Sequence, residues 1–140
     1  MKKSILFFFI FIGTFALAQS PKDQKTKYVT IDQKVCSNQK DFQLVLKSIV
    51  TDSRCPEGVT CIWAGEVTAI VSVYKDSKLI VDATLLFAMK NEKENKEWFA
   101  KYLPRKQKNI KTMQVLPYPK EGKKIDSKEY CLKIGYYKQD

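Results

Sequence analysis

Two cysteines six positions apart constrain this chain more than any other feature of its sequence. Cys55 and Cys61 enclose a proline and a glycine, both turn-forming residues, in the run DSRCPEGVTCIWAGEV at residues 52–67. We interpret this run as a disulfide-closed turn that leads into a core strand, with Trp63 anchoring the strand in the hydrophobic core. Closing so short a ring is expected to stabilise the fold by about 2.4 kcal/mol.

Two further cysteines, Cys36 and Cys131, bring the total to four. An even count in an exported chain is typical of two disulfides, for which three pairings exist. Cys36 lies near the start of the domain and Cys131 near its end, so we favour Cys55–Cys61 together with Cys36–Cys131. The longer ring is expected to contribute about 4.7 kcal/mol.

A metal site at the close cysteine pair is the alternative to a disulfide. Copper(I) between two thiolates is conceivable. Zinc would need closer spacing or histidine ligands, and the sequence contains no histidine. A redox pair of the C-x-x-C type is disfavoured by the spacing. We therefore predict neither a bound metal nor a cofactor.

The chain begins MKKSILFFFIFIGTFALA, which has the pattern of a secretory signal peptide. Two lysines precede an apolar run at residues 5–12, and residues 16–18 form a small-x-small cleavage pattern. A membrane anchor is the alternative, but the apolar run is short for a spanning helix. Gln19 stands where a bacterial lipoprotein needs cysteine. We predict export to the periplasm or the extracellular space without a lipid anchor.

Alternating apolar and polar residues dominate the rest of the chain and predict β-strands. A turn at residues 75–77 joins two of them into a hairpin. The alternating positions fall within residues 42–46, 63–73, 79–87, 113–115 and 130–136.

One segment, residues 91–103, has helical spacing instead. Asn91 and Glu94 are placed as in a capping box, and Pro104 would stop the helix. Trp98, Phe99, Tyr102 and Leu103 share adjoining positions of the helical wheel.

These patterns together predict an all-β fold. We expect an antiparallel β-sandwich of about six or seven strands with one short helical connection, stabilised by disulfides. The expected division is a signal peptide at 1–18, a loose polar leader at 19–27 and a single domain at 28–140.

The run Asp52-Ser53-Arg54-Cys55-Pro56, followed by Cys61-x-Trp63-Ala64-Gly65, resembles a motif of small exported proteins of Gram-negative bacteria that have no assigned activity. The stretch QVLPYPK at 114–120, before a tyrosine-rich final strand, is similar to the same group. The resemblance implies export and carries no mechanism with it. Cys36 and Cys131 are not part of the resemblance.

Arg54 has two interpretations. It can pair with Asp52 or Glu66 and lock the turn. Alternatively, the disulfide-closed loop at 54–61 presents Arg54 to a trypsin-like protease, because a rigid loop loses little entropy on binding. The second interpretation makes the protein a protease inhibitor.

A basic stretch at residues 101–124 is the second candidate site. Removing the two signal-peptide lysines from 25 basic residues and setting the rest against 15 acids leaves a net charge of +8. Such a charge favours an anionic polymer, a membrane surface or an acidic protein as partner. The alternatives are scattered lysines and a charge that serves solubility alone. The candidate residues are Lys101, Arg105, Lys106, Lys108, Lys111, Tyr118 and Lys120.

The sequence contains no motif for nucleophilic or phosphate chemistry and none for nucleic acid recognition, so neither an enzyme nor a nucleic acid partner is expected. Paired carboxylates among Asp52, Glu66 and Asp82 would be needed for a hydrolase. We predict a monomeric binding protein, with an inhibitor as the second hypothesis and a hydrolase as the third.

Overall fold

The computed structural model describes residues 25–34 and 41–137. The expected signal peptide at 1–18 and Cys36 lie outside the described residues. The elements are β1 (Thr26–Ile31), β2 (Gln43–Asp52), β3 (Val67–Lys75), β4 (Lys78–Phe87), η1 (Met89–Asn91), α1 (Glu92–Tyr102), η2 (Arg105–Gln107), β5 (Ile110–Leu116), η3 (Ser127–Glu129) and β6 (Cys131–Tyr137).

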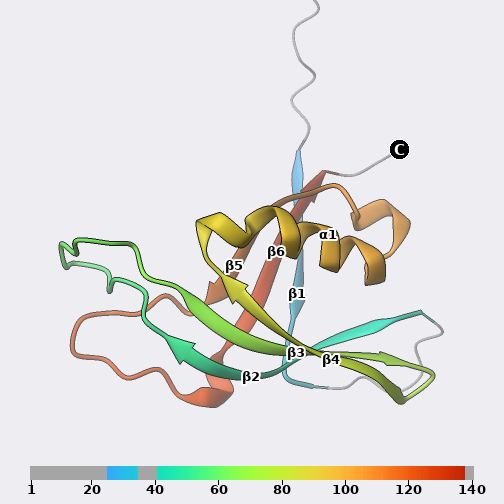
Figure 1. Ribbon diagram of the computed structural model, residues 1–140, viewed down its shortest axis with the longest axis horizontal. Coiled ribbons are helices and arrows are strands. Elements are labelled where there is room, and N and C mark those ends of the chain that lie inside the picture. Colours follow the sequence, from blue (N-terminus) through green and yellow to red (C-terminus); the bar gives the residue numbers. More distant parts are fainter. Residues whose placement is uncertain (1–24, 35–40, 138–140) are drawn as a thin grey trace, which may run out of the picture.

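The described strands form two antiparallel sheets of three strands each. We call the sheet with order β1-β6-β5 the terminal sheet and the sheet with order β2-β3-β4 the central sheet. Their strands run in different directions, and the long strands of the central sheet curve strongly (Figure 1). The prediction of a mostly antiparallel β fold with one helical connection is confirmed at this level.

A single hydrophobic core lies between the inner faces of the two sheets. Alternate residues of β3, from Val67 to Val73, are almost completely buried, as the alternation predicts. Leu132 and Ile134 of β6 face them from the terminal sheet and are equally buried. The edge strand β1 adds Ile31 to this core.

The β3–β4 hairpin closes through a two-residue turn. Asp76 and Ser77 both have positive φ, 49° and 59°, and Lys75 pairs with Lys78. Two left-handed residues in succession match the right-handed twist of the flanking strands. The predicted turn at 75–77 is therefore confirmed.

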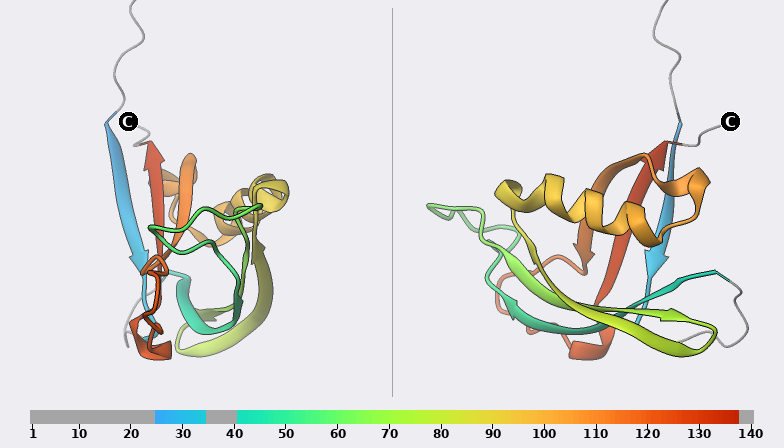
Figure 2. Two further views of the ribbon diagram at one scale, coloured as in Figure 1. Left: turned by 90° about the vertical axis from the view of Figure 1, so that its left-hand side faces the viewer. Right: turned by 45° about the vertical axis from the view of Figure 1, so that its right-hand side comes forward.

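The predicted helix forms as α1, and its chain becomes extended at Leu103 before Pro104. Phe99 is fully buried in the core, and α1 packs against both β4 and β5 (Figure 2). The expected capping box is wrong, because the Asn91 side chain makes no hydrogen bond to the helix backbone. Its Nδ2 instead donates to Glu94 Oε2 over 3.2 Å.

The predicted position of Trp63 is also wrong. Its side chain is 61% exposed, and the neighbouring Ile62 is fully exposed. The reason is that β3 begins only at Val67, and Gly65 adopts a left-handed conformation with φ of 75°. The alternation of β3 therefore cannot be extended back through Gly65 to Trp63.

Strand β1 is an element that the alternation did not reveal. It begins at Thr26, inside the segment expected to be a polar leader, and pairs with β6 along its whole length. Only Val29 and Ile31 turn apolar side chains inward, which is too short a pattern to identify from sequence. Within the described ranges, no helix has the length and hydropathy that a membrane span requires.

Candidate functional site

The disulfide-closed loop is tied to the rest of the protein by its backbone. The predicted Cys55–Cys61 disulfide is present, with the two Cα atoms 5.9 Å apart. The Cys55 amide donates to the Ala64 carbonyl over 3.0 Å, and the Glu57 amide donates to the Pro119 carbonyl over 2.9 Å. The loop is thus held both across its own base and to the segment that follows β5.

Gly65 allows this loop to close. A Cβ atom at this position would lie 2.0 Å from the carbonyl oxygen of Ser53. Its left-handed backbone is also one that residues with a Cβ rarely adopt. Ser53 and Glu66 continue the pairing on the strand side, where the Ser53 amide donates to the Glu66 carbonyl over 2.9 Å.

The Arg54 side chain points inward and is only 10% exposed. Its Nε donates to Asp52 Oδ1 over 2.9 Å, and Nη2 donates to Asp52 Oδ2 over 2.6 Å. The carbonyl of Pro117 accepts from Nη2 over 3.0 Å, and the carbonyl of Val115 accepts from Nη1. The guanidinium also lies 4.9 Å from the ring centre of Tyr118. Arg54 therefore joins the end of β2 to the end of β5.

Asp52 is held ionised by this arrangement. Burial raises the pKa of its carboxyl, but the hydrogen bonds and the charge of Arg54 outweigh burial and hold the pKa below its ordinary value. The Tyr130 hydroxyl also donates to Asp52 Oδ2 over 3.1 Å. These contacts fit the interpretation in which Arg54 locks the turn. To act as the residue that a protease inhibitor presents to its protease, Arg54 would have to give up all of these contacts.

The candidate residues of the basic stretch lie on either side of β5 along the chain. Five exposed cations precede β5 or stand at its start, whereas Tyr118 and Lys120 follow its end. A seven-residue strand such as β5 separates these ends by roughly 20 Å. The length of β5 therefore separates the last two residues from the first group. The first group is Lys101, Arg105, Lys106, Lys108 and Lys111.

The outer face of the terminal sheet carries two pairs of lysine and tyrosine that the sequence analysis missed. Lys133 Nζ lies 4.4 Å from the ring centre of Tyr28, which is 55% exposed. Lys111 Nζ lies 5.1 Å from the ring centre of Tyr137. The Tyr28 ring lies beside Gly135, where an added Cβ would stand 3.0 Å from its Cε1 atom. The sequence feature that could have revealed this face is the alternation of Lys133, Gly135 and Tyr137 along β6.

We call this outer face, together with residues 105–111, the cationic surface. Strands β1, β5 and β6 contain three lysines and no acidic residue, and residues 105–111 contain four basic residues and no acid. Asp32 follows β1 and lies near the Cys131 thiol, at the far end of β6 from Lys111. The strands and the loop of the cationic surface therefore contribute basic residues and no carboxylate of their own.

Cys131 is half-buried at the start of β6. Burial raises the pKa of its thiol, the Asp32 charge adds to the rise, and Lys133 lowers it. Cys36 follows Asp32 by four positions in sequence and lies outside the described residues, so the Cys36–Cys131 pairing stays a prediction. Counting reactive thiols in the unreduced native protein would test it, and we expect none.

The three carboxylates considered for a hydrolase are not brought together. Asp52 lies opposite Val67 of β3, whereas Asp82 lies opposite Ser72, five positions further along. Asp82 accepts from Lys47 Nζ over 2.5 Å and from Ser72 Oγ over 2.6 Å. Among the described residues there is also no group of three or more side chains that could hold a metal ion.

None of three comparisons, with protein-family models, with curated proteins and with solved structures, found a match for this chain. The resemblance to small exported proteins that share the cysteine and tryptophan motif therefore stays a prediction. The candidate sites are therefore distinguished by the contacts, burial and charge of their own residues.

Proposed function

We propose that this protein is an exported binding protein whose cationic surface recognises an anionic polymer of the cell envelope or the extracellular space. The observation that carries the proposal is the pair of lysine–tyrosine contacts on the outer face of a sheet whose strands contain no acidic residue; Tyr28 and Lys111 are exposed, and Lys133 and Tyr137 are half-buried. Clustered charge of one sign attracts a partner of opposite charge and speeds its encounter.

The chemistry of the surface suits an anionic polysaccharide. Lys133 and Lys111 stand on the neighbouring strands β6 and β5, so positive charge is present on both strands. Tyr28 and Tyr137 offer flat apolar rings between these charges, against which a sugar ring can pack. Arg105, Lys106 and Lys108 extend the same charge beyond the end of the sheet.

The proposal includes a β-sandwich as the scaffold. The inner faces of both sheets share one core, which supports this class of fold. In such a fold the outer face of the terminal sheet is free for binding, and core residues of the same strands keep its side chains in register.

The test measures binding of a sulfated polysaccharide such as heparin at several salt concentrations. We expect binding that weakens steadily as salt rises, because protein cations displace counterions from the polymer. The double charge reversal Lys111→Glu with Lys133→Glu should weaken binding at least tenfold. The control, Lys78→Glu with Lys93→Glu, makes the same change in net charge at exposed positions elsewhere and should bind nearly as well as the wild type.

Vesicles containing anionic lipid form a second arm of the same experiment. Binding to vesicles without binding to the polysaccharide would assign the surface to a membrane instead. Equal loss of binding in the test and control variants would show that net charge alone is responsible, and would contradict the proposed site.

A further inference from the structure

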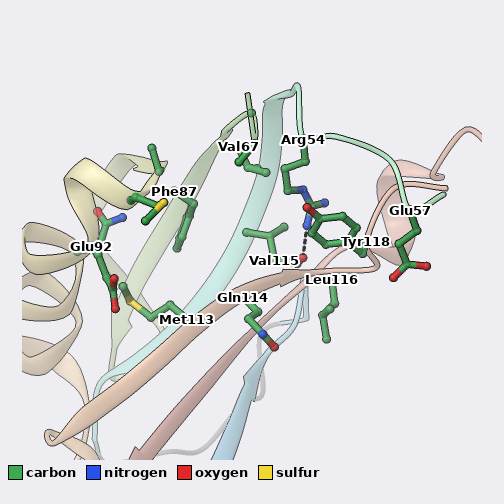
Figure 3. A pocket seen from close by; sticks show the side chains of 15 residues that line it. Arg54, Glu57, Val67, Phe87, Glu92, Met113, Gln114, Val115, Leu116 and Tyr118 are labelled. Carbon is green, nitrogen blue, oxygen red and sulfur yellow. Dashed lines mark hydrogen bonds between the residues drawn. The ribbon is translucent and has the colours of Figure 1, made fainter. Parts of the chain in front are cut away.

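A cleft lies on the opposite side of β5 from the cationic surface. It opens between β5, the ends of β3 and β4, and the start of α1, and its volume is about 480 Å³ (Figure 3). Small-molecule sites commonly have volumes of roughly 300–1,000 Å³. Its apolar wall is formed by Val67, Phe87, Met89, Met113, Val115 and Leu116.

The cleft is mainly apolar and adaptable. Val67 and Val115 belong to the buried core and give it a fixed floor. Met89, by contrast, is 90% exposed, and Met113 is partly exposed. Methionine side chains are flexible and polarisable, so they adjust to the shape of an apolar molecule.

The charges around the cleft disfavour an anionic ligand. Arg54 lines it, but four hydrogen bonds to Asp52, Val115 and Pro117 already occupy its guanidinium. Glu92 and Glu57 line opposite ends of the cleft (Figure 3). Each of these acids pairs with a lysine, Glu92 with Lys96 and Glu57 with Lys120. Arg54 is the one cation among the lining residues, so a carboxylate or phosphate group would find no available cation in the lining.

One buried polar group remains as a hydrogen-bond acceptor in the cleft wall. Asn95 of α1 is 5% exposed, and its Nδ2 donates to the Leu86 carbonyl over 2.9 Å. Within the described part of the chain this is the one side-chain hydrogen bond that Asn95 makes, which leaves its Oδ1 to accept another. The Asn95 Oδ1 atom is not fully enclosed, so a ligand in the cleft can reach it and donate a hydrogen bond to it.

We infer that this cleft binds an uncharged, mainly apolar small molecule that donates one hydrogen bond to Asn95. The inference is independent of the proposed function, because it uses other residues and the opposite chemistry. A second occupant to be tested is the exposed tip formed by Ile62 and Trp63 of another copy of the chain.

The test uses N-phenyl-1-naphthylamine, an uncharged fluorescent probe with a single N–H donor. We expect a saturable rise in probe fluorescence at one site per chain. Ala64→Trp places a large side chain at the edge of the cleft from an exposed position, and should weaken probe binding at least tenfold. The control Ile80→Trp adds a similar side chain at an exposed position of β4 outside the cleft lining, and should leave probe binding unchanged.

A matched ligand pair tests the hydrogen bond to Asn95. In 1-benzylnaphthalene a methylene replaces the N–H of the probe, and we expect it to compete roughly 2- to 12-fold more weakly, as expected for one lost hydrogen bond. Equal affinity of the two compounds would overturn the role of Asn95. The absence of saturable binding to the folded wild type, or full binding by Ala64→Trp, would overturn the site.

Two further measurements are needed. One distinguishes a small molecule from a second copy of the chain in the cleft, and the other distinguishes the cleft proposal from the proposed function of the cationic surface. A concentration-dependent dimer that is lost in Trp63→Ser and competes with the probe would assign the cleft to a second copy. The Lys111→Glu with Lys133→Glu variant should bind the probe like the wild type. Probe binding with no polysaccharide binding would therefore contradict the proposed function alone.

Discussion

Three cations lie over tyrosine rings in the described part of this protein, and two of them, Arg54 and Lys133, have different surroundings. The Arg54 guanidinium lies 4.9 Å from the Tyr118 ring centre, and Lys133 Nζ lies 4.4 Å from that of Tyr28. Arg54 is buried against the carboxylate of Asp52 and two backbone carbonyls. Lys133 stands on an outer face whose strands contain no acid. The same type of contact therefore closes the fold at one place and, in our proposal, belongs to a binding surface at the other.

Removing Arg54 and removing Lys133 should have different effects on stability, because the groups that each cation contacts are buried to different degrees. Removing one partner of a buried ion pair costs about 3–5 kcal/mol, because the other charge is left uncompensated. An exposed cation over an aromatic ring contributes only about 0.5–1 kcal/mol. Stability should therefore depend on Arg54 and partner affinity on Lys133, with little exchange between them.

The largest expected effect is that of Arg54→Ala. It leaves Asp52 buried without its cation and two carbonyls without a donor, and should lower the free energy of unfolding in urea by about 3–5 kcal/mol. Lys133→Ala should lower it by no more than about 1 kcal/mol. The exposed Arg105→Ala serves as the control. Similar losses of unfolding free energy for Arg54→Ala and Lys133→Ala would contradict the distinction between the two sites.

A smaller loss is expected from removing the short disulfide. Replacing Cys55 and Cys61 together by serine should lower the free energy of unfolding by about 2.4 kcal/mol, since the unfolded chain is no longer restrained. Heparin binding at the cationic surface should not change, because the backbone hydrogen bonds that hold the loop go to Ala64 and Pro119, which are not part of that surface. A loss of heparin affinity in the folded variant would show that the two regions are coupled.

The glycines of the same loop sharpen the comparison further. Gly65→Ala brings a Cβ against the Ser53 carbonyl, whereas Gly58→Ala meets no atom within 4 Å. Both glycines have positive φ, so each substitution should cost about 1 kcal/mol through the backbone alone. The steric clash should make Gly65→Ala the more destabilising of the two in thermal or urea unfolding. Equal losses would contradict the close approach at Gly65.

The smallest expected effect is a pH dependence. The pKa of Asp52 is lowered in the folded state, so its contribution to stability is present above the unfolded pKa of about 3.9 and is lost as pH falls through the folded pKa. The stability difference between wild type and Asp52→Asn should therefore be largest near neutral pH and shrink in acid. A difference that stays constant down to pH 2 would show that the ion pair does not link stability to pH.

Local patterns predicted much of this fold. The alternation in β3, β4 and β6 and the helical spacing before Pro104 each reflect one element packing one face on the core. The spacing of Cys55 and Cys61 likewise predicted their disulfide. These features depend on neighbours in the sequence, so they are visible in it.

The features that were missed depend on distant parts of the chain. Strand β1 is defined by its pairing with β6, and Trp63 is exposed because it precedes Gly65, after which β3 begins at Val67. The Lys133–Tyr28 contact joins two strands from opposite ends of the sequence. The basic stretch is continuous in sequence but is divided by the length of β5. Local sequence patterns do not predict which residues far apart in the chain come into contact.

The central claim is that the cationic surface, and not the disulfide-closed loop, meets an anionic partner. Backbone amide NMR shifts measured during titration with a sulfated oligosaccharide test it most directly. We predict that the shifts concentrate at Tyr28, Lys111, Lys133 and Tyr137 and disappear in the Lys111→Glu with Lys133→Glu variant. Shifts centred on residues 54–66, or none at low salt, would contradict the claim.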